Sequence, residues 1–172
     1  PAAVMYRNHQ SVTLTLHALA TLWLGLMAGF FAAYSANVNL AMLQMDGPTY
    51  ALVQSAFNRN VRHALFFCFF FGPPVWCTLT LMAAKQGRRH GWWWLLAAAG
   101  VIYLFGIIAV THQVNLPLNY QTETWSPQAL PPGWAAVRDQ WNAANLVRAV
   151  FSLVAFALAL TALALRAGRP PT

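Results

Sequence analysis

The sequence predicts an all-α polytopic membrane protein, a bundle of four transmembrane helices with two longer outer loops. Three observations support this prediction. Charged residues make up 8% of the 172 residues, against about 25% in an average soluble domain. Hydrophobic residues make up 59%, which is more than a soluble fold of this size can hide from water. Long uncharged stretches also divide the chain, and a spanning helix needs about 20 such residues.

We expect the chain to form a single membrane domain over residues 1–172, with transmembrane helices at about 12–34, 63–84, 92–111 and 141–165. The first three uncharged stretches are easily long enough to cross a bilayer. The last, from Ala149 to Leu165, covers only about 25 Å as a helix, less than the roughly 30 Å hydrocarbon core. The fourth helix should therefore begin near Trp141 and carry Arg148 into the membrane or to its edge. An arginine at that depth either marks a functional site or snorkels to the interface.

The distribution of Lys and Arg predicts the orientation, because cytoplasmic loops carry more of these residues. The residues expected on one face are Arg7, Lys85, Arg88, Arg89, Arg166 and Arg169. The opposite face has Arg59, Arg62, Arg138 and Arg148, together with all three acids, Asp46, Glu123 and Asp139. This bias predicts a protein of the cell (inner) membrane with its N- and C-termini in the cytoplasm. The loops at about 35–62 and 111–140 then face outward.

Several functional classes have no support in the sequence. The net charge of +7 comes from only ten Lys and Arg, and no nucleic-acid-binding motif accompanies them. We therefore expect the lipid bilayer, and no nucleic acid, as a partner. The chain has no GxGxxG, P-loop, HExxH or CxxC motif. It also lacks the paired intramembrane carboxylates of proton-driven transporters.

Polar residues gather where the predicted helices reach the outer face. They are Asn37, Asn39, Arg62, His63, Thr111, His112, Asn115, Asn119, Trp141, Asn142, Asn145 and Arg148. In an up-down bundle these groups share one membrane face, and Trp141, Asn145 and Arg148 share one helical face at i, i+4, i+7. The pattern favours a pocket. The alternative is that each amide only caps a helix or bonds across the bundle.

The histidines are candidates for metal binding or for proton transfer. His63 and His112 can meet at the outer face, whereas His17 lies a bilayer away. Two histidines without a nearby carboxylate or cysteine are a weak metal signature, so we predict no cofactor and no metal site. A metal held by His63 and His112 is the second possibility. Either histidine can instead act as a proton acceptor, because an imidazole takes up a proton near neutral pH.

The residues that carry these polar groups also resemble a family. The run THQVNLPLN at 111–119 resembles the T-x-x-V-N-x-P-L-N signature of the anthrone-oxygenase-like membrane proteins. The run WNAANLVR at 141–148 resembles that family's W-x-x-x-N-H-V-R pattern, with Leu146 in place of its histidine. The segments GFF at 29–31 and NVN at 37–39 are similar to its first-helix region. Many bacterial members have no assigned function.

The resemblance implies a four-helix bundle that oxidises a hydrophobic aromatic small molecule with O2, as a monooxygenase without flavin or haem. His112 or His63 would then remove a proton, and Arg148 would stabilise the resulting anion. The substrate-binding residues would be Asn37, Asn39, Asn115, Asn119, Trp141 and Asn145. The alternative is a non-catalytic small subunit of a larger membrane complex, or a binder of a lipid or quinone-like ligand. Leu146 favours that alternative, because it replaces a histidine of the family pattern. The eight Trp and eleven Phe also offer apolar surface to membrane-protein partners.

Overall fold

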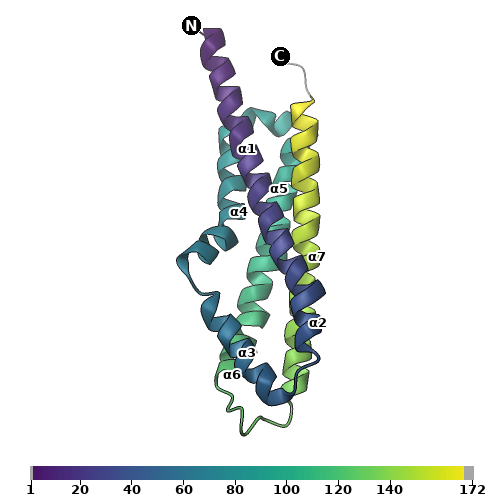
Figure 1. Cartoon of the computed structure of the whole chain (residues 1–172). Helices are drawn as coiled ribbons and strands as arrows, with labels where there is room; N and C mark the ends of the chain where they lie inside the picture. The colour runs from purple at the N-terminus through teal and green to yellow at the C-terminus, as the bar shows by residue number, and fades with distance from the viewer. Residues whose placement is uncertain (1, 169–172) are drawn as a thin grey trace.

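The computed structural model describes residues 2–168, and this part of the chain folds into helices joined by short connections. Four helical segments are long and apolar enough to cross a membrane: Asn8–Met42, Ala64–Ala83, Gly91–Glu123 and Trp134–Ala167. They run up and down side by side, and both termini lie at the same end of the bundle (Figure 1). The predicted all-α, four-span fold class is confirmed. We call the end opposite the termini the distal end.

The first span is one continuous helix with a change of winding near its distal end. It consists of α1 (Ala2–Ala33), the π-helical turn η1 (Tyr34–Val38) and α2 (Asn39–Met42). No proline and no charged residue interrupts the chain from Asn8 to Met42, so nothing breaks the ladder of backbone hydrogen bonds. A π-helical turn inserts extra chain into a helix and re-aims the side chains that follow it. The span therefore extends beyond the expected end near residue 34.

A short helix, α3 (Gly47–Asn60), follows the first span at the distal end. Asp46 caps its N-terminus, accepting a hydrogen bond from the backbone N–H of Thr49 at 2.8 Å, and Pro48 occupies the first turn, where its missing N–H costs least. The bonds from Thr49 hold the pKa of the Asp46 carboxyl below its usual range. A fall in pH that protonates this carboxyl therefore weakens the cap.

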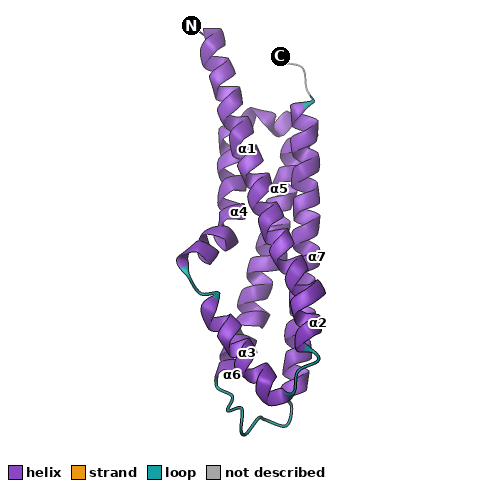
Figure 2. Cartoon of the chain, viewed as in Figure 1, coloured by secondary structure: helices purple, strands orange, loops and turns teal. Residues whose placement is uncertain are grey.

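The helix α3 is held against α6 (Leu116–Glu123), as Figures 1 and 2 show at the distal end. The side chains of Ser55 and Asn58 both donate to Thr122, at 3.3 Å to its carbonyl oxygen and 3.1 Å to its hydroxyl. Arg62 forms a two-pronged ion pair with Glu123. These polar contacts hold α3 and Arg62 against α6, the distal part of the third span.

The second span, α4 (Ala64–Ala83), contains Pro73 and Pro74 in its interior. A proline has no N–H, so the carbonyl four residues earlier loses its helical partner. For Pro74 that carbonyl belongs to Phe70, and the hydroxyl of Tyr103 donates to it at 2.9 Å. A neighbouring helix thus supplies the missing bond, as is required where no water is present.

The third span starts after the 3₁₀ turn η2 (Lys85–Arg89). It consists of α5 (Gly91–Tyr103), two π-helical segments, η3 (Leu104–Ala109) and η4 (Thr111–Asn115), and then α6. We expected this helix to end at residue 111, but it continues to Glu123. Pro117 does not end the helix, because this proline lies in the first turn of α6, directly after the π-helical segment.

The fourth span, α7 (Trp134–Ala167), is a single helix of 34 residues. It begins before Ala149, as the shortness of the uncharged run required, but at Trp134 and so earlier than the expected start near Trp141. Small residues on one side, Ala155, Ala159 and Ala162, are fully buried and allow close packing against α1 and α5. Large apolar side chains of α7 face outward; Val150 and Leu165, for example, are each 51% exposed. That surface suits lipid rather than water.

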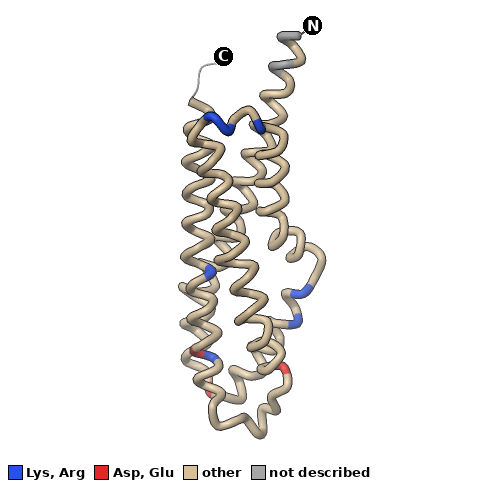
Figure 3. Tube along the Cα trace, turned by 180° about the vertical axis from the view of Figure 1, so that it is seen from behind, with Lys and Arg blue, Asp and Glu red and all other residues tan. Residues whose placement is uncertain are grey.

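The charges divide between the two ends of the bundle. Figure 3 shows basic residues at the end with the termini, whereas the acids lie toward the distal end, where further basic residues accompany them. Near the termini, Arg166 donates to the carbonyl oxygen of Thr13 at 2.9 Å and lies 4.5 Å over the ring of Trp92. At the end with the termini, Arg166 of α7 therefore contacts both α1 and α5.

A stability prediction follows from the contact between η3 and α7. A Cβ added at Gly106 would lie 2.5 Å from Cβ of Phe151, closer than real atoms approach. We expect Gly106→Ala to lower the free energy of unfolding by about 1–3 kcal/mol through overpacking, measured as a lower melting temperature in detergent. Gly29→Ala is the matched control, because nothing lies within 4 Å of its Cβ position. Equal melting temperatures for the two variants would contradict the close packing.

Candidate functional site

A buried arginine on α7 is the centre of the candidate site. Arg148 is 7% exposed. One of its terminal nitrogens donates to Oγ1 of Thr111 at 3.1 Å, and the other donates to Oδ1 of Asn145 at 2.7 Å. Its guanidinium carbon lies 4.8 Å from the ring centroid of Phe31 and 5.6 Å from that of Trp141. Neutral oxygens and aromatic faces therefore surround the charge.

No carboxylate balances this cation within the described part of the chain. The ion pairs there join Arg62 to Glu123 and Arg138 to Asp139. Burying a charge without an opposite charge is costly, and hydrogen bonds to neutral groups offset that cost only in part. Arg148 is thus an electrostatic site suited to a negative charge that arrives or develops nearby.

Three spans supply the polar groups around Arg148. Asn145 precedes it by one turn of α7 and donates from Nδ2 to Oγ of Ser35 on η1 at 2.7 Å. Trp141, a further turn away, donates from Nε1 to Oδ1 of Asn119 on α6 at 2.6 Å. The i, i+4, i+7 spacing places these α7 side chains on one face. The resulting network ties the first, third and fourth spans together.

Several buried polar atoms near this network have no hydrogen-bond partner among the described residues. They include both amide atoms of Asn115, which is 1% exposed, Oδ1 of Asn39 and Nε of Arg148. Asn115 lies on the same π-helical segment as Thr111, the acceptor for Arg148. Buried polar groups in proteins are nearly always paired, so unpaired ones need a water, an ion or a ligand. The distal half of the bundle therefore offers polar groups to something further.

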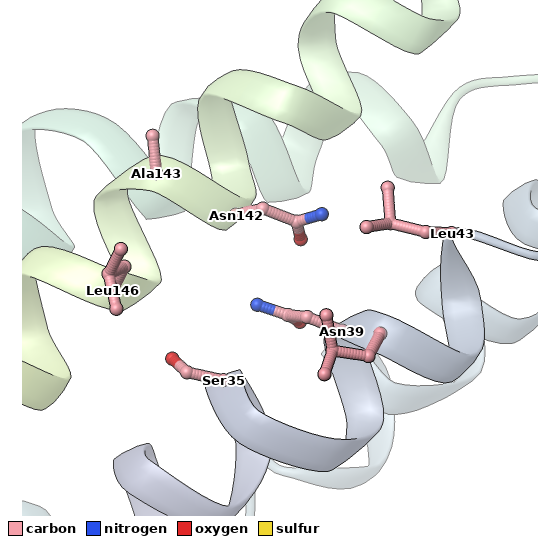
Figure 4. Close-up of a pocket in the computed structure, with 7 residues that line it drawn as sticks. Ser35, Asn39, Leu43, Asn142, Ala143 and Leu146 are labelled. Atoms are coloured by element: carbon pink, nitrogen blue, oxygen red, sulfur yellow. The ribbon is translucent and has the colours of Figure 1, made fainter.

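A groove of about 210 Å³ opens beside the network, between the first span and α7 (Figure 4). Its polar wall consists of Ser35, Asn39 and Asn142, and leucines and an alanine supply the rest. Leu146, the residue at the position of the family pattern's histidine, lines this groove and is 56% exposed. The groove therefore lies next to the Arg148 network, and Ser35 belongs to both.

The structure brings together some of the predicted site residues and separates others. Trp141, Asn145, Arg148 and Asn119 are linked by the bonds above, Asn39 lines the groove, and Asn115 is buried nearby. Asn37 is exposed. Ser35 and Phe31 were not predicted. Ser35 lies four residues before Asn39 but in the π-helical turn η1, where regular helical spacing does not predict which side chains share a face.

The two candidate histidines lie on the surface. His63 is exposed and caps α4, its Nδ1 accepting from the backbone N–H of Phe66 at 3.2 Å. His112 is exposed, and no hydrogen bond joins it to the Arg148 network within residues 2–168. In that same range, no group of three or more His, Cys, Asp or Glu side chains is placed to hold a metal ion.

A family model described as anthrone oxygenase matches residues 65–158, more than half of the chain. The matched region includes Thr111, Asn115, Asn145 and Arg148 and begins after the first span. No curated protein and no solved structure shows significant similarity to the chain. The match agrees with the resemblance carried by the runs at 111–119 and 141–148, and the chain belongs to the anthrone oxygenase family.

Proposed function

We propose that this protein is a membrane oxygenase that uses O2 to oxidise a hydrophobic aromatic carbon acid of the anthrone type. The observation that carries the proposal is Arg148, a buried cation bonded only to neutral groups. A site of this kind binds a neutral substrate weakly and its anion strongly. Such a difference between ground state and charged intermediate is what accelerates a reaction.

The proposed reaction begins with loss of a proton from the methylene carbon of the anthrone. The resulting enolate carries its charge on the carbonyl oxygen, and Arg148 stabilises that charge, with Asn115 and Asn145 supplying further polar contacts. The electron-rich carbon transfers an electron to O2, and the radical pair combines to a hydroperoxide. Loss of water then leaves a second carbonyl group. One oxygen atom enters the quinone and the other leaves as water, so the substrate supplies every electron that O2 takes up.

The proton acceptor in this proposal is His112, with His63 as the alternative. His112 follows Thr111 directly in the chain, and the hydroxyl of Thr111 holds Arg148. An imidazole is suited to accept a proton near neutral pH. Trp141 lies 5.4 Å from the ring of Tyr34, and these aromatic faces would pack against the rings of the substrate.

We further propose that the termini are cytoplasmic, that the membrane is the cell (inner) membrane, and that the site faces its outer side. Lys85, Arg88, Arg89 and Arg166 lie on segments at the end with the termini (Figure 3). The positive-inside rule favours that end as the cytoplasmic one. A hydrophobic substrate and O2 both concentrate in the bilayer, so they would reach the site from the membrane.

The test is oxygen uptake by the purified protein in nanodiscs supplied with an anthrone. We expect uptake above that of empty nanodiscs, equal in amount to the anthraquinone formed, with one atom from ¹⁸O2 in the product. His112→Ala should lower the rate if His112 accepts the proton, and His90→Ala serves as its control on the far side of the bundle. Uptake no faster than in empty nanodiscs would contradict the oxygenase.

A second candidate function is a binder of a quinone-like ligand or lipid, or a small subunit that itself performs no chemistry. The observation that favours it is Leu146, which gives the groove an aliphatic wall at the position where the family pattern has a histidine. Retention of a hydroxyanthraquinone without oxygen uptake would support the binder. Stable co-purification with other membrane proteins, again without turnover, would support the subunit.

A further inference from the structure

The turn that joins the second and third spans lies at the depth of the lipid headgroups. The helix α4 has 20 residues, which cover about 30 Å as a helix, the thickness of the hydrocarbon core. Because α4 is the shortest span, its two ends mark the borders of that core. The turn η2 follows α4 at the end with the termini (Figure 3). Trp94, near the start of α5, is 60% exposed, as is typical of tryptophans at the membrane interface. The side chains of η2 therefore reach the headgroups of that leaflet.

Three cations on this turn have no counter-charge. Lys85, Arg88 and Arg89 are all exposed. The ion pairs within residues 2–168 engage Arg62 and Arg138 instead, and the acids lie toward the distal end of the bundle (Figure 3). Like charges this close together in the chain repel one another, and an anion placed among them relieves that repulsion. The turn is therefore suited to a negatively charged group.

Three consecutive tryptophans at the start of α5 hold the backbone of this turn. Nε1 of Trp94 donates to the carbonyl oxygen of Arg88 at 3.0 Å. The guanidinium carbon of Arg88 lies 5.2 Å from the ring centroid of Trp93. Gly87 is buried against the ring of Trp92, which leaves no room for a Cβ at that position. The backbone that carries the three cations is thus fixed before a ligand arrives, which lowers the entropy lost on binding.

We propose that η2 binds the phosphate headgroup of an anionic phospholipid such as phosphatidylglycerol. The planar forks of Arg88 and Arg89 match the oxygens of a phosphodiester, and Lys85 adds a third positive charge. The acyl chains of the same lipid then lie along the apolar surface of the spans, beside Trp94. A zwitterionic lipid binds less tightly, because its own ammonium group is repelled by the three cations. The proposal rests on this turn alone and does not depend on the oxygenase.

The experiment compares two lipids on the purified protein. Phosphatidylglycerol or phosphatidylcholine is added to the protein in a non-ionic detergent, and native mass spectrometry measures the fraction of molecules that carry a lipid. We expect a higher affinity for phosphatidylglycerol, and Arg89→Gln should weaken it about fivefold, the effect of one cation near an anionic headgroup. Arg59→Gln is the matched control, because Arg59 is an exposed arginine of α3 at the distal end, and its affinity should equal that of the wild type.

Replacing Lys85, Arg88 and Arg89 together by glutamine should abolish the preference between the two lipids. These cations also favour the orientation of the chain in the membrane, so a second measurement on the wild type covers the case in which the triple variant does not insert. A rise in the ammonium acetate concentration should weaken the binding of phosphatidylglycerol through screening and leave that of phosphatidylcholine unchanged. Equal affinities of the wild type for the two lipids would overturn the proposal, as would wild-type affinity for phosphatidylglycerol in a folded triple variant.

Discussion

If the protein is the proposed oxygenase, we expect Arg148→Gln to reduce the rate of anthrone oxidation to that of empty nanodiscs, a loss of at least about 10²–10³-fold, as for removal of a group that stabilises an oxyanion. The reason is the position of the charge. The guanidinium is buried and is bonded to Thr111 and Asn145, and among residues 2–168 it forms no ion pair with a carboxylate. A developing enolate is the group that would complete this arrangement. Oxygen uptake measured with the purified variant checks the result.

Glutamine is chosen because it separates charge from packing. Glutamine keeps an uncharged, hydrogen-bonding group on the same aliphatic stem, and the melting temperature of the variant reports how far the contact with Thr111 contributes to stability. Arg138→Gln is the control, since Arg138 lies on the same helix, near its start, and pairs with Asp139 on the surface. Its rate should not change. Equal rates for the two variants would remove Arg148 from the mechanism.

Much of the fold could be predicted from the sequence, because charge and hydrophobicity alone determine which stretches cross a membrane. The end of the third span could not. The most apolar part of the third stretch ends near residue 110, which predicted the end of the helix at residue 111, whereas the π-helical turn Thr111–Asn115 carries the helix into α6 with Pro117 in its first turn. The sequence gives no sign of which carbonyl a distant side chain will satisfy, as Tyr103 does for Phe70.

The site was predictable where it depends on regular helical spacing. Trp141, Asn145 and Arg148 share a face on a regular α-helix, and the structure joins them to Asn119 and Thr111. Ser35 was missed because it lies in a π-helical turn, where the spacing of 3.6 residues no longer describes which side chains share a face. The positions of His63 and His112 in the chain could not predict the direction of their side chains, which are exposed.

The network around Arg148 admits two interpretations: a structural clamp between spans or a site held open for an anion. Asn145→Asp separates them. Oδ1 of Asn145 lies 2.7 Å from a terminal nitrogen of Arg148, so a carboxylate at this position forms an ion pair with a cation that is already buried. The clamp is retained or strengthened, and the melting temperature should not fall. The positive potential available to a substrate is cancelled.

We therefore expect Asn145→Asp to be folded and inactive, with a rate as low as that of Arg148→Gln. The new carboxylate also accepts the hydroxyl proton of Ser35, so the contact between the first and fourth spans is retained. Asn60→Asp, an exposed change of the same charge at the C-terminal end of α3, is the control and should leave the rate and the melting temperature unchanged. A stable Asn145→Asp protein with the wild-type rate would show that Arg148 is a clamp, because an enolate cannot be stabilised by a cation that a neighbouring carboxylate has already neutralised.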